Sequence, residues 1–186
     1  MRIIGGNFRG KKISLPKDNE TRPLRDLVKE SIFNLINHSN KFNCKIYNSE
    51  ILDLFSGSGS FGLECISRSA KKVTFVENYQ VALYVLKKNI RSLDVKNKIE
   101  IFEENCFSFF QSKQNYIKKY DLIFMDPPYK EDKINTLIEI IIKEKILKKK
   151  GILIIHRHKK DNVKISEKVQ ILDERNYGIS KIIIGN

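Results

Sequence analysis

The chain has few cysteines and no long apolar run, and each shortage excludes a class of protein. Its three cysteines, Cys44, Cys65 and Cys106, are odd in number and form no CxxC pair. They therefore predict neither a disulfide framework nor a zinc site. No stretch of about 20 apolar residues is present, so we expect no transmembrane helix. The first residues lack the apolar region and cleavage site of a signal peptide, so we expect a cytoplasmic protein.

Acidic residues are also scarce relative to basic ones. The 186 residues include 35 lysines and arginines but only 22 aspartates and glutamates, which gives a net charge of +13. Such a charge favours a polyanionic partner, because each phosphate neutralised by a basic side chain releases counterions. A lysine-rich compositional bias would produce the same excess, so charge alone leaves nucleic-acid binding as a hypothesis. The hydrophobic content of 41% is enough to form the core of one domain.

From residue 51 onward, strand-like and helix-like segments alternate. The predicted strands are residues 51–55, 72–77, 98–103, 120–126 and 151–156, and the predicted helices are residues 61–68, 79–93, 106–113 and 134–147. Residues 167–185 read as two further strands joined near Gly178. In the helix of residues 79–93 we expect Val81, Val85 and Leu86 to face inward. This order predicts a mostly parallel sheet with helices on both faces and an antiparallel edge.

Residues 1–45 are expected to form an N-terminal extension integral to the domain, whose main body is residues 46–186. Residues 1–14 predict a short hairpin or basic arm with a turn at Gly5-Gly6. A helix should follow, with Thr21 as its cap and Pro23 in its first turn. The residues expected to share one face of that helix are Leu24, Leu27, Val28, Leu35 and Ile36.

A glycine-rich turn follows the first strand of the alternating region. Gly57, Gly59 and Gly62 have the spacing GxGxxG, which permits a tight turn and a close approach of a ligand to the backbone. Glu77 ends the next strand about 20 residues later, where a carboxylate can bind ribose hydroxyls. Asp53 precedes the turn, where its charge would repel a pyrophosphate but attract a cationic amino acid group. These residues favour S-adenosylmethionine over NAD.

The fourth strand of this region ends in Asp126-Pro127-Pro128-Tyr129. Asp126 and the carbonyl of Pro127 can accept hydrogen bonds from an exocyclic amine, and the prolines hold these acceptors rigidly. Tyr129 can stack on a base held out of its helix. The segment therefore predicts methyl transfer to a base amine. His156 and His158, on a later strand end, are interpreted as surface or RNA-facing residues rather than catalytic ones.

Five segments together resemble one family. Besides Asp-Pro-Pro-Tyr they are "MRIIGGNFRGKKI", "TRPLRDLVKESIFNLI", "LDLFSGSGSFGLECISRSA" and "ERNYGIS". They resemble the RsmD family of bacterial 16S rRNA guanine-N2 methyltransferases, over nearly the whole chain. The resemblance implies an α/β class I methyltransferase (Rossmann-like) fold, with a mostly parallel seven-stranded sheet, an antiparallel edge strand and a short N-terminal extension. It also implies S-adenosylmethionine as cofactor, no metal, and a monomer whose partner is 16S rRNA, the small ribosomal subunit or its assembly intermediate.

The resemblance further implies the site residues. The implied cofactor contacts are Asp53, Ser56, Gly57, Gly59, Glu77, Asn105 and Arg22, and the implied catalytic residues are Asp126, Pro127, Pro128 and Tyr129. Asn105 would contact the adenine, while Arg22, Pro23 and Asp26 match a segment that closes over cofactor and substrate. The implied RNA contacts are Arg2, Arg9, Lys11, Lys12, Arg22 and Arg25. The chain departs from the family at His156, where relatives commonly have Glu.

Three other functions fit parts of the pattern. A DNA adenine-N6 methyltransferase would use the same Asp-Pro-Pro-Tyr segment, but it usually needs a separate recognition domain, for which this chain has no spare length. A nicotinamide-dependent oxidoreductase would use the glycine turn and leave residues 126–129 unexplained. An RNA-binding module that has lost its cofactor would not need Glu77 or Asp126.

Overall fold

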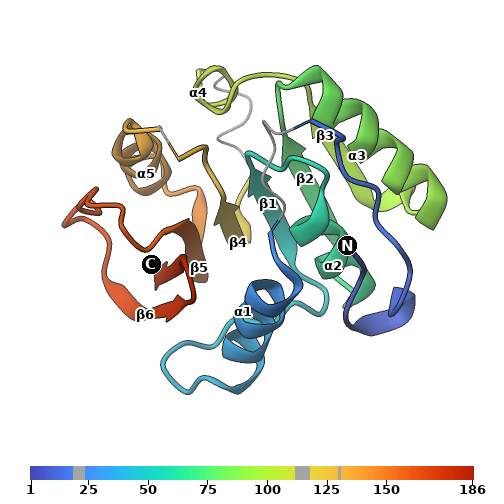
Figure 1. Cartoon of the computed structure of the whole chain (residues 1–186). Helices are drawn as coiled ribbons and strands as arrows, with labels where there is room; N and C mark the ends of the chain where they lie inside the picture. Colours follow the sequence, from blue (N-terminus) through green and yellow to red (C-terminus); the bar gives the residue numbers. More distant parts are fainter. Residues whose placement is uncertain (19–23, 112–117, 130) are drawn as a thin grey trace.

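The sheet at the centre of the molecule has seven strands. A computed structural model describes residues 1–18, 24–111, 118–129 and 131–186. In chain order the strands are β1 (Glu50–Leu54), β2 (Lys72–Val76), β3 (Ile99–Phe102), β4 (Tyr120–Met125), β5 (Leu147–His158), β6 (Ile171–Tyr177) and β7 (Ser180–Gly185). They lie side by side as β3-β2-β1-β4-β5-β7-β6, with β1 to β5 parallel and β7 antiparallel to both of its neighbours (Figure 1). The predicted fold class is confirmed.

Helices cover both faces of the sheet. They are α1 (Asp26–His38), α2 (Ser60–Ser67), α3 (Gln80–Leu93), α4 (Cys106–Phe109) and α5 (Ile134–Lys143), with 3-10 turns at Gly6–Phe8 and Lys96–Lys98. Alternate residues of each strand point to opposite faces. Accordingly, Ile51 belongs to a core that includes α1, α2 and α3, whereas Leu52 belongs to a second core that includes α4 and α5.

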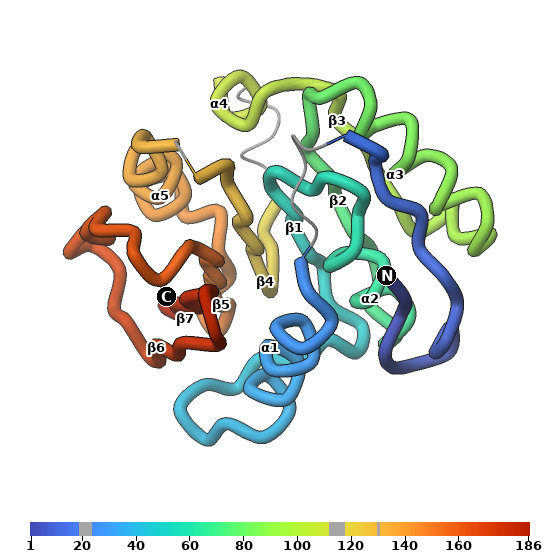
Figure 2. Tube along the Cα trace, in the orientation of Figure 1, coloured from blue at the N-terminus to red at the C-terminus, as the bar shows by residue number. Residues whose placement is uncertain are grey.

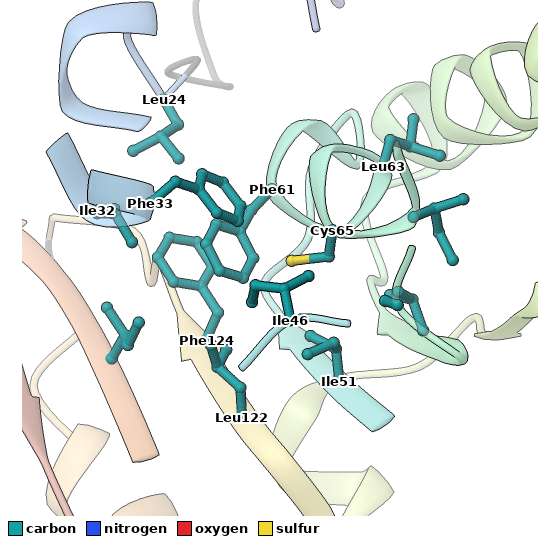
Figure 3. Packing of buried hydrophobic residues seen from close by; sticks show 14 of the residues in the cluster. Leu24, Ile32, Phe33, Ile46, Ile51, Phe61, Leu63, Cys65, Leu122 and Phe124 are labelled. Carbon is teal, nitrogen blue, oxygen red and sulfur yellow. The ribbon is translucent and has the colours of Figure 1, made fainter. Parts of the chain in front are cut away.

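A stack of aromatic rings joins α1 and α2 to the centre of the sheet. Phe61 lies between Phe33 and Phe124, at ring-centroid distances of 5.3 Å and 3.9 Å (Figure 3). Such stacking stabilises an aromatic pair by about 0.5–1.5 kcal/mol beyond burial of its area. The stack fixes the start of α2, and with it the glycine turn, against β4.

Several predicted details are wrong. Leu27 is 68% exposed, because the buried face of α1 is formed by Val28, Ile32, Phe33 and Ile36 instead. Val81 is 42% exposed at the first turn of α3, although Val85 and Leu86 are buried as expected. The predicted cap Thr21 and the predicted first-turn Pro23 lie outside the described residues.

The boundary between α5 and β5 also differs from the prediction. The helix ends at Lys143 rather than at residue 147, and β5 begins at Leu147 rather than at Gly151. Tyr120 pairs with Leu147 and Leu122 pairs with Ile152, so an irregularity in β5 accommodates the extra residues. Because this stretch is rich in lysine, its composition does not resemble that of a buried strand.

The N-terminal segment forms the expected hairpin and packs on α2. Arg2 and Lys12 form an antiparallel bridge, with Gly6–Phe8 at the tip. Figure 2 shows the segment running beside α2 and α3. Its tip is fixed at the end of α2, where the backbone N–H of Phe8 donates to Ser67 Oγ at 2.9 Å.

A buried ion pair connects this hairpin with α1 and α2. Lys29 and Glu64 have fully buried side chains, and their charged groups lie 3.6 Å apart. Glu64 accepts the backbone N–H groups of Ile4 and Gly5, at 2.8 Å each, while Lys29 donates to the carbonyl of Arg2 at 2.8 Å. Burial lowers the pKa of Lys29, and the charge of Glu64 opposes that shift. Among the described residues, no helix is long and apolar enough to cross a membrane.

Candidate active site

The candidate site lies where the strand order of the sheet reverses. From β1 the chain proceeds outward through β2 to β3 on one side, and through β4 to β5 on the other. In such sheets ligands bind at the carboxyl ends of the strands beside this switch point. Leu54 and Met125 are paired at these ends, and Asp126 follows directly. The switch point therefore brings the glycine turn and the Asp-Pro-Pro-Tyr segment together.

Asp53 is a buried carboxyl group at this point. It is 1% exposed, and its Oδ2 accepts the backbone N–H of Gly62 at 3.0 Å. Burial raises the pKa of Asp53 well above its ordinary value, and the negative charges of Asp126 and Glu77 raise it further. No basic side chain among the described residues contributes to that shift. A cationic ligand would supply the missing charge, so the site fits the amino acid portion of S-adenosylmethionine.

Glu77 holds the glycine turn in place. Its Oε2 accepts the backbone N–H of Gly57 at 2.7 Å, and its Oε1 accepts those of Asn78 and Tyr79 at 2.9 Å and 2.8 Å. Ser56 attaches the turn to the same strand end, since its N–H and hydroxyl both donate to the carbonyl of Val76. A carboxylate oxygen can accept more than one hydrogen bond, so Glu77 retains the capacity to bind ribose hydroxyls.

Two glycines are required by the geometry of the turn. Gly59 has a φ of +80°, and a Cβ there would lie 2.4 Å from Leu86 Cδ1. A Cβ on Gly62 would lie 2.3 Å from Phe75 Cε1, so the absence of a side chain lets α2 pack closely on β2. Phe55, just before the turn, has a φ of +57°, an uncommon conformation for an aromatic residue.

The side chain of Asp126 is bound from β5. Its Oδ1 lies 2.8 Å from Nδ1 of His156, and both side chains are largely shielded from solvent. Two residues further along β5, the ring of His158 meets the ring of Tyr129 edge to face, at 5.5 Å between centroids. Tyr129 is nevertheless 55% exposed, and it lines an open cavity of about 250 Å³ together with Arg157 and Asp161. It thus has room to contact a flat ligand.

Arg157 holds the backbone that follows Asp126. Its guanidinium group is buried and paired with Asp161. It donates to the carbonyl of Glu131 at 3.1 Å, and more weakly to those of Pro128 and Tyr129 at 3.4 Å and 3.5 Å. The carbonyl of Pro127 accepts no hydrogen bond from the described residues. It therefore stays available as the predicted acceptor.

The interpretation of His156 and His158 as surface or RNA-facing residues misses their contacts with the Asp-Pro-Pro-Tyr segment. His156 contacts Asp126 and His158 contacts Tyr129, so both belong to the candidate site. The sequence contained one usable signal. The two histidines alternate at the end of the strand that pairs with β4, and this spacing directs both side chains to the same face.

Asn105 occupies the expected place after β3. Its side chain caps α4, where Oδ1 accepts the N–H of Phe107 at 2.8 Å. The second lone pair of this oxygen can still accept from an adenine amine. Asp26 lies in the first turn of α1, with Oδ1 at 3.8 Å from Lys29 Nζ. Arg22 lies outside the described residues.

Among the predicted RNA contacts, Arg2 lies near the start of α2, where its carbonyl and the hydroxyl of Ser60 both accept hydrogen bonds from Lys29 Nζ. Arg2 and Lys12 face each other across the hairpin, and Lys11 lies over the ring of Phe8. Arg9 follows the hairpin tip, which packs at the far end of α2 from the glycine turn. The eight residues of α2 separate those two ends by about 12 Å. Arg25, exposed at the start of α1, completes the described set.

Comparison with known proteins identifies the family. A family model described as "Conserved hypothetical protein 95" matches residues 1–186. The Ribosomal RNA small subunit methyltransferase D of Haemophilus influenzae is 33% identical over 180 residues, which cover 96% of this chain and 90% of that protein. The chain belongs to the RsmD family. The protein of the same name from Buchnera aphidicola subsp. Acyrthosiphon pisum is 35% identical, and the match covers 87% of this chain and 80% of that protein.

Two solved structures whose titles refer to methyl transfer share the fold of this chain. The HI0767 protein of Haemophilus influenzae, named as a methylase, has a TM-score of 0.77 at 30% identity, over 99% of this chain and 96% of that one. The yhhF protein of Escherichia coli, named as a methyltransferase, has a TM-score of 0.82 at 25% identity, over 100% and 96%. The protein is therefore a methyltransferase of this family. The described residues contain no cluster of metal ligands.

Proposed function

We propose that the protein transfers a methyl group from S-adenosylmethionine to the exocyclic N2 amine of a guanine in 16S rRNA. The observation that carries this proposal is the placement of Asp126 to Tyr129 at the switch point, beside Asp53 and the glycine turn. The names of the relatives, which refer to the RNA of the small ribosomal subunit, support the class of substrate. The proposed partner is the small subunit or its assembly intermediate, bound by a monomer in the cytoplasm.

The proposed cofactor contacts follow from charge and backbone geometry. The Asp53 carboxylate would bind the ammonium group of the cofactor, and the Glu77 carboxylate would bind its ribose hydroxyls. Gly57 and Gly59 both have positive φ angles, which let the backbone form the tight turn that would contact the cofactor. Asn105 would accept a hydrogen bond from the adenine.

The proposed chemistry needs a base amine whose lone pair is freed from the ring. When bound, S-adenosylmethionine supplies a methyl group whose bond to the sulfonium sulfur breaks as a bond to the amine nitrogen forms. Asp126 and the Pro127 carbonyl would accept hydrogen bonds from the two N–H groups of the amine. These bonds would favour a more tetrahedral nitrogen, whose lone pair is less delocalised into the ring and can point at the methyl group. Tyr129 would stack on the extruded base. The prolines and Arg157 keep these groups in place, so the residues contribute mainly by positioning.

A labelling assay tests the proposal. Radiolabelled S-adenosylmethionine would be offered with unmodified small subunits, naked 16S rRNA and duplex DNA, and the products digested to nucleosides. We expect label in N2-methylguanosine from subunits or rRNA. Label in N6-methyladenine, from DNA or from another RNA, would contradict the guanine assignment and support the adenine alternative. Asp126→Ala should retain affinity for S-adenosylhomocysteine and lose turnover, and full turnover by this variant would refute the role given to Asp126.

A further inference from the structure

His156 and Asp126 form a hydrogen bond whose direction follows from their chemistry. An ionised carboxylate can only accept, so the 2.8 Å contact between Asp126 Oδ1 and His156 Nδ1 requires a proton on Nδ1. Both the neutral Nδ1–H tautomer and the charged imidazolium carry that proton. The histidine is therefore a donor to Asp126 in either state of charge.

The donor is carried by the more rigid of the two segments. His156 lies within β5, where its neighbour Ile155 pairs with Met125 of β4 and His156 itself pairs with Ile182 of β7. Asp126, by contrast, lies one residue beyond β4. A side chain held on a strand between two others can fix the rotamer of one that follows a strand end.

The second oxygen of Asp126 is left for the substrate. Among the described residues, Oδ2 of Asp126 has no hydrogen-bond partner. We propose that His156 is a positioning residue, which donates from Nδ1 to Oδ1 of Asp126 and so presents Oδ2 to the target amine. This inference rests on the proposed function. His156 lies outside the Asp-Pro-Pro-Tyr segment, and it would orient the acceptor Asp126 within that segment.

Asp126 and His156 have different roles toward the proton that the amine loses. As the new carbon–nitrogen bond forms and the carbon–sulfur bond breaks, the amine nitrogen gains positive charge and must lose one proton. Oδ2 of Asp126 receives that proton and releases it to solvent after the product leaves. His156 keeps its Nδ1 proton throughout, so it orients the carboxylate without relaying the proton.

Three variants separate the hydrogen bond from the packing of the ring. His156→Leu removes the donor, whereas His156→Asn keeps an N–H close to the position of Nδ1. His38→Leu makes the same change at an exposed histidine that ends α1. For His156→Leu we expect kcat to fall about 10- to 100-fold, the range seen when a positioning partner is removed from a metal ligand. The KM for S-adenosylmethionine and the Kd for S-adenosylhomocysteine should stay within about twofold. His156→Asn should recover most of kcat, and His38→Leu should match the wild type.

Two results would overturn the inference. One is wild-type turnover in His156→Leu. The other is a His156→Asn variant as impaired as His156→Leu at an unchanged melting temperature, which would assign the effect to the ring and not to the N–H.

NMR of ¹⁵N-histidine-labelled protein supplies a readout that needs no turnover. We expect a protonated Nδ1 at His156 whose signal shifts in Asp126→Ala. An unprotonated Nδ1 would refute the hydrogen bond whatever the kinetics. If the wild type methylates no guanine, the proposed function fails, and this measurement still decides whether His156 donates to Asp126.

Discussion

The carboxylate of Glu77 accepts the backbone N–H of Gly57 across 2.7 Å, although the two residues are 20 positions apart. The side chain expected to bind the ribose therefore also holds the turn expected to approach the cofactor. Because both are fixed before any ligand arrives, little conformational entropy remains to be lost on binding.

Replacing Glu77 should weaken cofactor binding and stability together. In Glu77→Ala the N–H groups of Gly57, Asn78 and Tyr79 lose their acceptor, at a cost of about 1–3 kcal/mol for an unsatisfied buried group. We expect the Kd for S-adenosylhomocysteine to rise at least about tenfold by calorimetry, with a lower melting temperature. Glu77→Gln, which keeps an acceptor oxygen, should have a Kd and a melting temperature between those of the wild type and Glu77→Ala. An unchanged Kd in Glu77→Ala would show that the turn is positioned by other contacts.

Asp53→Asn should stabilise the protein while impairing cofactor binding. The pKa of Asp53 is raised in the folded state, so ionisation costs the folded state more than the unfolded one. Below the unfolded pKa of about 3.9, the raised pKa of Asp53 does not change the free energy of unfolding. As the pH rises above that value, Asp53 lowers the free energy of unfolding. The variant should melt at a higher temperature than the wild type at pH 7.5, and at a similar temperature at pH 3.5. Equal melting temperatures at pH 7.5 would contradict this.

The carboxyl group of Asp53 should also couple cofactor binding to proton release. A cationic ligand favours the ionised form of Asp53, so binding of S-adenosylhomocysteine, which carries an ammonium group, should become tighter as pH rises. Calorimetry in two buffers with different ionisation enthalpies would measure the protons released. Asp53→Asn is the control and should release fewer.

Replacing only Glu64 of the buried Lys29–Glu64 pair should lower the stability of the protein more than replacing both residues. In Glu64→Gln, Lys29 loses its buried counter-charge and keeps only the partly exposed Asp26 at 3.8 Å. Removing one partner of a buried pair typically costs about 3–5 kcal/mol. The double variant Lys29→Met with Glu64→Gln should recover part of that loss in urea unfolding. A double variant less stable than Glu64→Gln alone would indicate that Lys29 stabilises the fold mainly through its bonds to Arg2 and Ser60.

Arg157→Ala should affect turnover more than cofactor binding. The guanidinium group contacts the backbone carbonyls after Asp126, but none of its hydrogen bonds involves the glycine turn. We expect kcat to fall about tenfold or more with the Kd for S-adenosylhomocysteine unchanged, in keeping with the cost of misplaced groups. Arg91→Ala, on the exposed face of α3, is the matched control. A variant that lost cofactor affinity instead would show that Arg157 supports the whole edge of the sheet.

The sequence predicted the order of strands and helices because each strand is a short apolar run between helical patterns. It predicted the place of Asp53, Gly57 and Asp126, since ligand sites in such sheets follow strand ends. It failed at β5, where lysines occupy an irregular strand start that pairs with β4 and whose Lys148 forms an ion pair with Asp121. It also failed at Leu27, because a short apolar cluster does not reveal which of its residues contact the sheet.

The contacts of His156 and Arg157 could not be predicted for a different reason. Each joins β5 to a segment about 30 residues away in the chain, and no local pattern marks such a pair. The partners of Glu64 are more distant still, since Ile4 is 60 positions away. Local propensity specifies elements, whereas these polar contacts depend on how the elements are assembled.

The separation of Ile4 and Glu64 also has a consequence for synthesis of the chain. The N–H groups of Ile4 and Gly5 gain their acceptor only after 60 further residues have been added, which takes about 3–12 s at ordinary rates of translation. The hairpin therefore cannot complete these contacts before α2 has been synthesised. During that interval its apolar Ile3, fully buried in the finished protein, stays exposed to water and to chaperones.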